Sequence, residues 1–143
     1  MPHRLTVEIL GETAAAVARA SDAEAIGLAG LSRIGDPDAA DRPGALKQGE
    51  VDRRIFGFFL VLPGRERMML FAEHGWPEEQ HRLVASTDNG RPGWTVRNGR
   101  PCVCPNTDED PLFTQILKTT RMGSTIYAPL LWKGETLGLI NFA

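Results

Sequence analysis

Two pairs of apolar segments, each joined by a short turn, constrain the fold of this chain most strongly. The first pair is IFGFFLVLP at 55–63 and RMMLFAEHG at 67–75, and the second is STIYAPLLW at 124–132 and ETLGLINF at 135–142. Pro-Gly lies between the first two segments and Lys-Gly between the second two. β-Branched and aromatic runs bounded by such residues are typical of hairpin strands. The sequence therefore predicts two β-hairpins. The first strand has apolar residues at both parities, as expected of a strand covered on both faces.

Helical patterns precede the first hairpin. Residues 5–19 favour a helix with an alanine-rich centre, and Ser21-Asp-Ala-Glu24 is a capping-box pattern that predicts a second helix reaching Ile34. The Asp-, Pro- and Gly-rich residues 35–50 predict a loop.

Shorter elements are predicted between the hairpins. They are a helix at 77–86, a helix from Pro92 to Gly99, a short strand in PCVCPN at 101–106, and a helix that begins at Pro111 with Asp110 as its N-cap. The Asp108–Asp110 run is most simply explained as helix-cap chemistry. Helices between antiparallel hairpins predict the α+β class and not a wound parallel sheet.

Size and charge narrow the function classes. The 143 residues suit one domain. Sixteen Lys and Arg against eighteen Asp and Glu give a net charge of −2, and the scattered basic residues disfavour nucleic-acid binding. The apolar stretch 55–62 is far shorter than the roughly 18 residues of a membrane span. We find no signal-peptide pattern and no disulfide framework, so we expect a cytoplasmic protein without membrane attachment.

Cys102 and Cys104 are the two cysteines of the chain. In a strand they would face the same side with Cα atoms roughly 6.6–6.8 Å apart, at the upper edge of disulfide reach. A structural metal site needs about four ligands, and the three histidines are not at metal-like spacing. We expect two small buried apolar residues. A redox-active or metal-touching pair facing a pocket remains the alternative.

Residues 90–142 resemble the C-terminal half of a GAF domain. The resemblance rests on Gly93-Trp94 in a short helix running into NGRP, on EDPLF at 109–113, on the Gly123–Leu131 stretch with its Pro-Leu pair, and on the Lys133–Phe142 hairpin. It implies an antiparallel sheet of five or six strands, with leading helices on one face and short helices roofing a pocket on the other. A single domain would then span 1–143, with leading helices at about 5–34, a loop at about 35–50 and the sheet and roof at about 54–142. The resemblance also implies that the closing helix of the family would lie beyond these residues.

The same resemblance implies a sensory role. A regulatory GAF domain would bind a small molecule and transmit the signal through its flanking helices. Asn141 is followed by Phe142 and not by the lysine of cyclic-nucleotide members, and neither cysteine is followed by the histidine of tetrapyrrole binders. Cyclic nucleotides and tetrapyrroles are therefore both disfavoured as ligands, and the ligand and any cofactor are left unidentified.

Two alternatives remain open. One is a GAF fold that serves only as a dimerisation scaffold with a filled pocket. The other is a thiol enzyme related to the free-methionine-sulfoxide reductases. Their first cysteine stands where this chain has Pro92-Gly93-Trp94, and their last lies beyond the strand of Cys104, so we expect no enzyme.

Seven side chains are candidate ligand contacts. Trp94 would lie over a ligand from the roof helix, and Arg91 at that helix's N-terminus would hold a carboxylate or phosphate. Ser124 would donate a hydroxyl if it points to the pocket, although a solvent-facing serine is the simpler reading. The full set is Arg91, Trp94, Cys104, Phe113, Met122, Ser124 and Tyr127. For Trp94 a core role is equally expected, and for most of the others a core or surface role is the simpler interpretation.

The expected partners follow from the same reading. They are the unidentified small molecule, a second copy of the chain in contact through the helix at about 5–20, and an output domain in a longer protein.

Overall fold

A computed structural model describes residues 55–113 and 123–143, together with isolated positions before residue 50 (8, 11, 12, 14–16, 18, 19, 21, 22, 25, 27 and 48). The chain divides into two compact units, Met1–Asp41 and Arg42–Ala143. The expectation of a single domain over 1–143 stays a prediction.

In the first unit, the described positions between 8 and 19 are helical, as the alanine-rich pattern predicts. Ala25 and Gly27 are the described residues of the second predicted helix, and both are helical. Asp22 Oδ1 accepts the backbone N–H of Ala25 at 2.8 Å, and Ser21 Oγ donates to Asp22 Oδ2 at 3.1 Å. Asp22 therefore satisfies a free N–H of the first turn. The capping box with Glu24 lies outside the described residues and stays a prediction.

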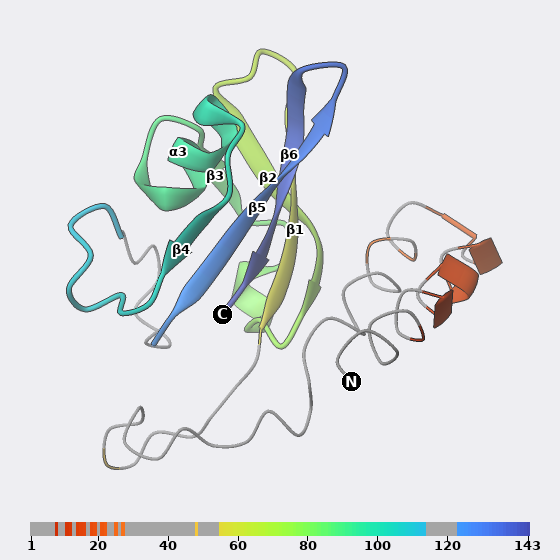
Figure 1. The fold of residues 1–143 in the computed structure, drawn as a ribbon, viewed down its shortest axis with the longest axis horizontal. Coiled ribbons are helices and arrows are strands. Elements are labelled where there is room, and N and C mark those ends of the chain that lie inside the picture. Colours follow the sequence, from red (N-terminus) through yellow and green to blue (C-terminus); the bar gives the residue numbers. More distant parts are fainter. Residues whose placement is uncertain are drawn as a thin grey trace. The chain divides into compact units, whose positions relative to one another are not determined.

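The second unit is built on one six-stranded sheet in the order β3-β2-β1-β6-β5-β4 (Figure 1). All of its pairs are antiparallel. The strands are β1 (Phe56–Val61), β2 (Arg67–His74), β3 (Val84–Ser86), β4 (Cys102–Cys104), β5 (Thr125–Trp132) and β6 (Glu135–Phe142). Both predicted hairpins are present, and the β1–β6 pair joins them at the centre of the sheet.

The second hairpin turns at Lys133 and Gly134. Their φ angles are 49° and 82°. A two-residue hairpin loop of this kind needs positive φ at both central residues, which glycine adopts freely and lysine at a small cost.

The sheet needs a glycine at Gly138. A Cβ on Gly138 would lie only 2.1 Å from the carbonyl oxygen of Phe59 on the neighbouring strand. No side chain fits there, so the close approach of β1 and β6 depends on this residue.

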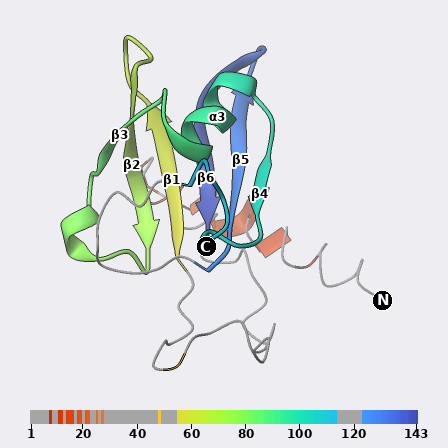
Figure 2. The same cartoon turned by 90° about the vertical axis from the view of Figure 1, so that its left-hand side faces the viewer.

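The described helix α3 (Gly90–Asn98) lies over β6 and β5 (Figure 2). It ends where the sequence predicts. Gly99 adopts φ 59° and its N–H donates to Thr95 O at 2.9 Å, a left-handed C-terminal cap. The predicted roof helix is therefore confirmed.

The helix predicted over 77–86 is wrong in its second half. A single 3₁₀ turn, η1 (Glu78–Gln80), is followed by Arg82 at φ 58°, and Val84–Ser86 then pairs with Arg67–Met69 as β3. The positive φ at Arg82 ends any helix there. The free edge of β2 gives the next residues backbone partners, which a weak helical preference does not outweigh.

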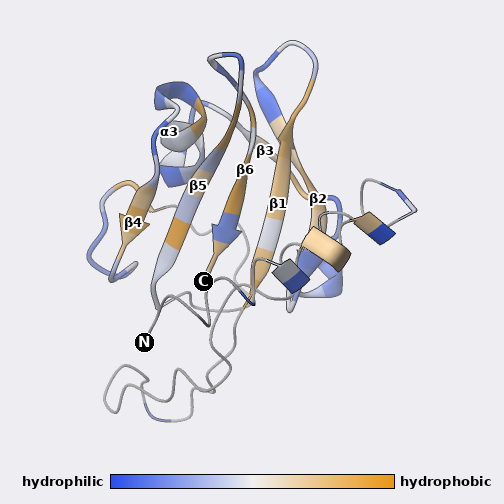
Figure 3. Cartoon of the chain, turned by 45° about the vertical axis from the view of Figure 1, so that its right-hand side comes forward, coloured by the Kyte–Doolittle hydropathy of each residue, from blue (hydrophilic) through white to orange (hydrophobic). Residues whose placement is uncertain are grey.

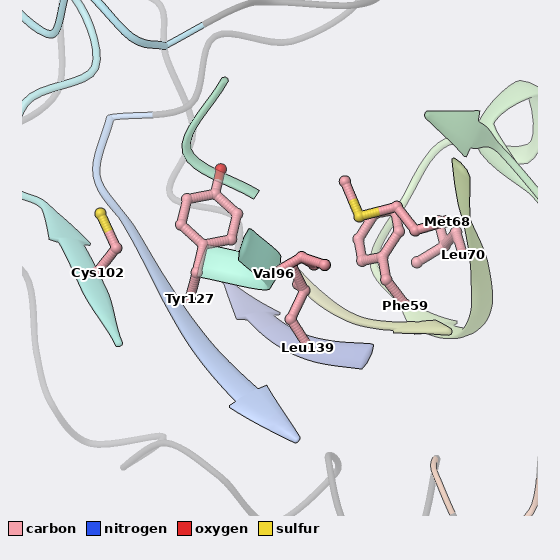
Figure 4. Close-up of a cluster of buried hydrophobic side chains, with 7 residues drawn as sticks. All are labelled: Phe59, Met68, Leu70, Val96, Cys102, Tyr127 and Leu139. Carbon is pink, nitrogen blue, oxygen red and sulfur yellow. The ribbon is translucent and has the colours of Figure 1, made fainter. Parts of the chain in front are cut away.

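The core lies between α3 and the sheet. Val96 of α3 packs with Phe59, Leu139 and Tyr127 from the three strands β1, β6 and β5. The complete buried cluster, drawn in Figure 4, is Phe59, Met68, Leu70, Val96, Cys102, Tyr127 and Leu139. The central strands can form this buried cluster because they are largely apolar (Figure 3). Within the described residues, no helix is long and apolar enough to span a bilayer.

Candidate functional site

The first turn of α3, strand β4 and the loop after β4 meet around one ion pair. Arg91 Nε donates to Asp110 Oδ2 at 2.7 Å, and Arg91 Nη2 donates to Asp110 Oδ1 at 2.9 Å. The Asp110 side chain is only 5% exposed. This two-point geometry holds a guanidinium and a carboxylate more firmly than a single contact does. The pair therefore ties the helix to the loop.

Local sequence explains the shape of the loop. The side-chain oxygen of Asn106 accepts the N–H of Asp108 at 3.1 Å, and Asp110 Oδ1 accepts the N–H of Leu112 at 2.9 Å. Asn and Asp favour such turns because their short side chains bond to the backbone two residues ahead. Phe113 N also donates to Asp110 O at 3.1 Å. Asp110 therefore caps a turn, and Pro111–Phe113 are not helical although the sequence predicts a helix that begins at Pro111; residues 114–122 lie outside the described residues.

Both cysteines of β4 lie beside this ion pair. Arg91 Nη1 donates to Cys102 Sγ at 3.6 Å, and Cys104 lines the same hollow as Asp110. Cys102 and Cys104 are buried and free, whereas Val103 between them is 62% exposed. The prediction that both cysteines share one buried face is confirmed.

The electrostatics follow from these contacts. The hydrogen bonds from Arg91, and then from Cys104, hold the pKa of Asp110 well below its usual range. The hydrogen bond to Asp110 likewise raises the pKa of Arg91. Burial, followed by the hydrogen bond to Asp110, raises the pKa of Cys104 to about 11. Cys104 is therefore a neutral thiol at neutral pH.

A hollow of about 220 Å³ opens beside the ion pair. Its wall contains two of the predicted ligand contacts, Arg91 and Cys104. The remaining lining residues are Val103, Pro105, Asn106, Glu109, Asp110 and Pro111.

A buried polar chain crosses the sheet next to the hollow. Cys102, Tyr127 and Asn141 are direct neighbours on β4, β5 and β6, and Figure 4 shows the first two on adjacent strands. Asn141 Nδ2 donates to Thr125 Oγ1 at 2.8 Å. Burial raises the pKa of Tyr127 to about 12. Within the described part of the chain, Asn141 Oδ1 and Thr95 Oγ1 are buried without a hydrogen-bond partner.

The other predicted contacts are dispersed. Trp94 is half-buried and packs against the core cluster, Phe113 is half-buried at the end of the loop, and Ser124 is exposed. Met122 lies outside the described residues. The structure therefore brings Arg91 and Cys104 together, with Tyr127 near them, and does not gather the remaining candidates around the hollow.

Sequence reasoning missed three residues of this region. Asp110 was interpreted only as a helix cap, Thr95 carried no signal, and Asn141 was considered only for the residue after it. The Arg91–Asp110 contact spans 19 positions, and no local pattern identifies such a partner. The one available hint was the run of three acidic residues at 108–110, which follows an expected roof helix that carries arginines. Among the described residues, no group of three or more His, Cys, Asp or Glu side chains could hold a metal ion.

Comparison with known proteins agrees with the family resemblance noted in the sequence. The sequence model of the GAF domain family matches residues 6–143. None of the curated proteins matches the sequence.

Several solved structures are similar to this chain. The GAF domain of a phosphoenolpyruvate-protein phosphotransferase from Coxiella burnetii has a TM-score of 0.76 at 17% identity, over 95% of this chain and 75% of that one. The GAF domain of the Acinetobacter phosphoenolpyruvate-protein phosphotransferase gives 0.74 at 12% identity, over 96% and 75%. Free methionine-R-sulfoxide reductase from Neisseria meningitidis, solved with its substrate, gives 0.66 at 17% identity, over 99% and 74%. At these identities the likeness shows the fold alone.

Proposed function

Because this chain belongs to the GAF domain family, we propose that it is a regulatory domain that binds a small molecule beside α3 and passes the signal through the helices flanking its sheet. The observation that carries the proposal is the hollow between α3, β4 and the following loop, with the Arg91–Asp110 pair in its wall.

The mechanism would be linkage between two arrangements of the loop and α3. A ligand in the hollow touches the helix through Arg91 and the loop through Asp110. If it binds one arrangement better, it shifts the population toward that arrangement by its difference in affinity. An attached output domain would read that shift. Two of the similar structures are GAF domains taken from a phosphotransferase, which supports an output domain here.

A thiol-dependent reductase is the second candidate, because a structural neighbour is a free methionine-R-sulfoxide reductase. The raised pKa of Cys104 disfavours a reductase. A nucleophilic cysteine needs a lowered pKa, and the pKa of Cys104 is raised to about 11. We therefore place regulatory binding ahead of catalysis.

A dimerisation scaffold is the third candidate. Trp94 packs against the core instead of leaving space beneath α3, which is what a filled interior would require. We also propose that the helix at about 5–20 contacts a second copy in a cytoplasmic homodimer. Sedimentation of a variant lacking residues 1–20 tests this contact, and a deletion variant that stays dimeric would exclude it.

Native mass spectrometry of freshly purified protein, compared with its denatured mass, tests the binding proposal. We expect an additional non-covalent mass that is lost on denaturation. A bare chain seen only as a dimer would support the scaffold instead. A mass that persists on a cysteine after denaturation would support thiol chemistry.

A further inference from the structure

The charges in the wall of the hollow indicate which ligands it accepts. We infer that the hollow prefers a small cationic ligand, such as a primary amine, to a small anion, and that Asp110 sets this preference. The inference rests on the proposed function, because it assigns a ligand class to the same hollow.

The arginine of the hollow is already engaged by the protein's own carboxylate. Arg91 directs Nε and Nη2 at the two oxygens of Asp110, at 2.7 and 2.9 Å, and its Nη1 at Cys102 Sγ. The site that sequence reasoning offered to a carboxylate or phosphate ligand is therefore filled by Asp110. An incoming anion would have to displace a two-point, largely buried carboxylate.

A second carboxylate leaves the wall negative. Glu109 lines the hollow beside Asp110 and is solvent-exposed. No ion pair to its side chain occurs within residues 55–113 and 123–143. Among the described lining residues the charges of Arg91 and Asp110 cancel, so the carboxylate of Glu109 is the excess charge that they present to a ligand. Opposite charge at short range attracts, and like charge repels.

The rest of the wall suits a short apolar chain. Val103, Pro105 and Pro111 provide apolar surface. A volume of about 220 Å³ is that of roughly seven water molecules at about 30 Å³ each. An ammonium group on a chain of a few carbons would place its charge at Glu109 and its methylenes against Val103 and the prolines.

Asp110 is the residue that fixes the sign of this selectivity. The neutral carboxamide of Asp110→Asn keeps the shape but cannot cancel the charge of Arg91. The guanidinium would then be free to bind an anion, and the preference should move from amine to carboxylate.

Isothermal titration with n-butylamine and butyrate tests the inference, because the two probes share a carbon chain and differ in the sign of their charge. We expect the wild-type chain to bind butylamine more tightly than butyrate. Glu109→Gln should weaken butylamine binding by up to about fivefold, because an ion pair with an exposed carboxylate contributes at most about 1 kcal/mol, and Asp110→Asn should raise the affinity for butyrate. Asp108→Asn is the matched control, since Asp108 is adjacent but does not line the hollow.

Three outcomes would overturn the inference. The first is that the wild type binds butyrate more tightly than butylamine. The second is that Glu109→Gln and Asp108→Asn lower the affinity for butylamine equally. The third is that neither probe binds. If native mass spectrometry still reveals a bound molecule in these cases, only the ligand class fails; a bare chain would remove the proposed binding function as well. Should Asp110→Asn not fold, as judged by circular dichroism, Glu109→Gln still decides the question because it leaves the ion pair intact.

Discussion

Asp110 joins helix α3 to its own loop through one side chain, and it also raises the pKa of Cys104 on β4. Its oxygens accept hydrogen bonds from Arg91 on α3 and from the backbone of Leu112 in the loop. The same carboxylate therefore fixes the loop and tunes the chemistry of its neighbours.

The Cys104 thiol should respond to Asp110. Because Asp110 raises the pKa of Cys104 and the charge of Arg91 lowers it, Asp110→Asn should shift that pKa downward from about 11. The measurement is the rate of iodoacetamide alkylation against pH in a Cys102→Ala background, where Cys104 is the one remaining thiol. A profile of Asp110→Asn identical to that of its parent would contradict the assigned contact.

Tyr127 offers a second residue-level test, because it is the one tyrosine in the chain. Burial raises its pKa to about 12, so its phenolate absorbance should appear near that pH in the folded protein and near the ordinary value of about 10 in urea. The raised folded pKa means that the folded state holds its proton longer. Stability should therefore fall as the pH rises above about 10. A native titration midpoint at the unfolded value would show that the phenol is accessible to water.

Elements differ in how far the sequence predicts them. The hairpins β1–β2 and β5–β6 were predictable because turn residues and neighbouring apolar runs encode them locally. β3 was not, because Val84–Ser86 forms a strand only by pairing with the edge of β2. The hollow was predictable only in part. Its elements α3 and β4 were predicted, but the Arg91–Asp110 contact in its wall forms only in the tertiary fold.

The close contact of β1 and β6 leads to a graded prediction for two glycines. Gly138→Ala would place its Cβ 2.1 Å from a backbone oxygen of Phe59, whereas Gly57→Ala would meet the end of the Leu70 side chain at 2.8 Å. A side-chain end can rotate away and a strand backbone cannot. We expect Gly138→Ala to lower the free energy of unfolding by about 1–3 kcal/mol or more, and Gly57→Ala by less. Urea denaturation of both variants gives the ranking, and a larger loss at Gly57 would contradict it.

At the scale of the molecule, acid stability should depend on the Arg91–Asp110 pair. The folded-state pKa of Asp110 is lowered below its usual value. The ionised carboxylate therefore contributes its full stability above about pH 4, the ordinary carboxyl value, and this contribution is lost as the pH falls below it. Arg91→Met removes the guanidinium that lowers the pKa of Asp110. The stability of this variant should therefore change less than that of the wild type between pH 6 and pH 3, which lie about two units above and about one unit below the ordinary carboxyl pKa. Denaturation midpoints at both pH values test this, and an unchanged acid slope would exclude the pair as its source.

The ends of the sheet have a consequence for the behaviour of the protein at high concentration. The outermost strands, β3 and β4, have three residues each. Pro101 and Pro105 flank β4, and Pro129 interrupts the N–H row of β5 where β4 no longer covers it. A foreign strand can form few backbone hydrogen bonds along such edges. We therefore expect edge-to-edge pairing of two copies through β3 or β4 to be weak, even though Val103 on β4 is exposed.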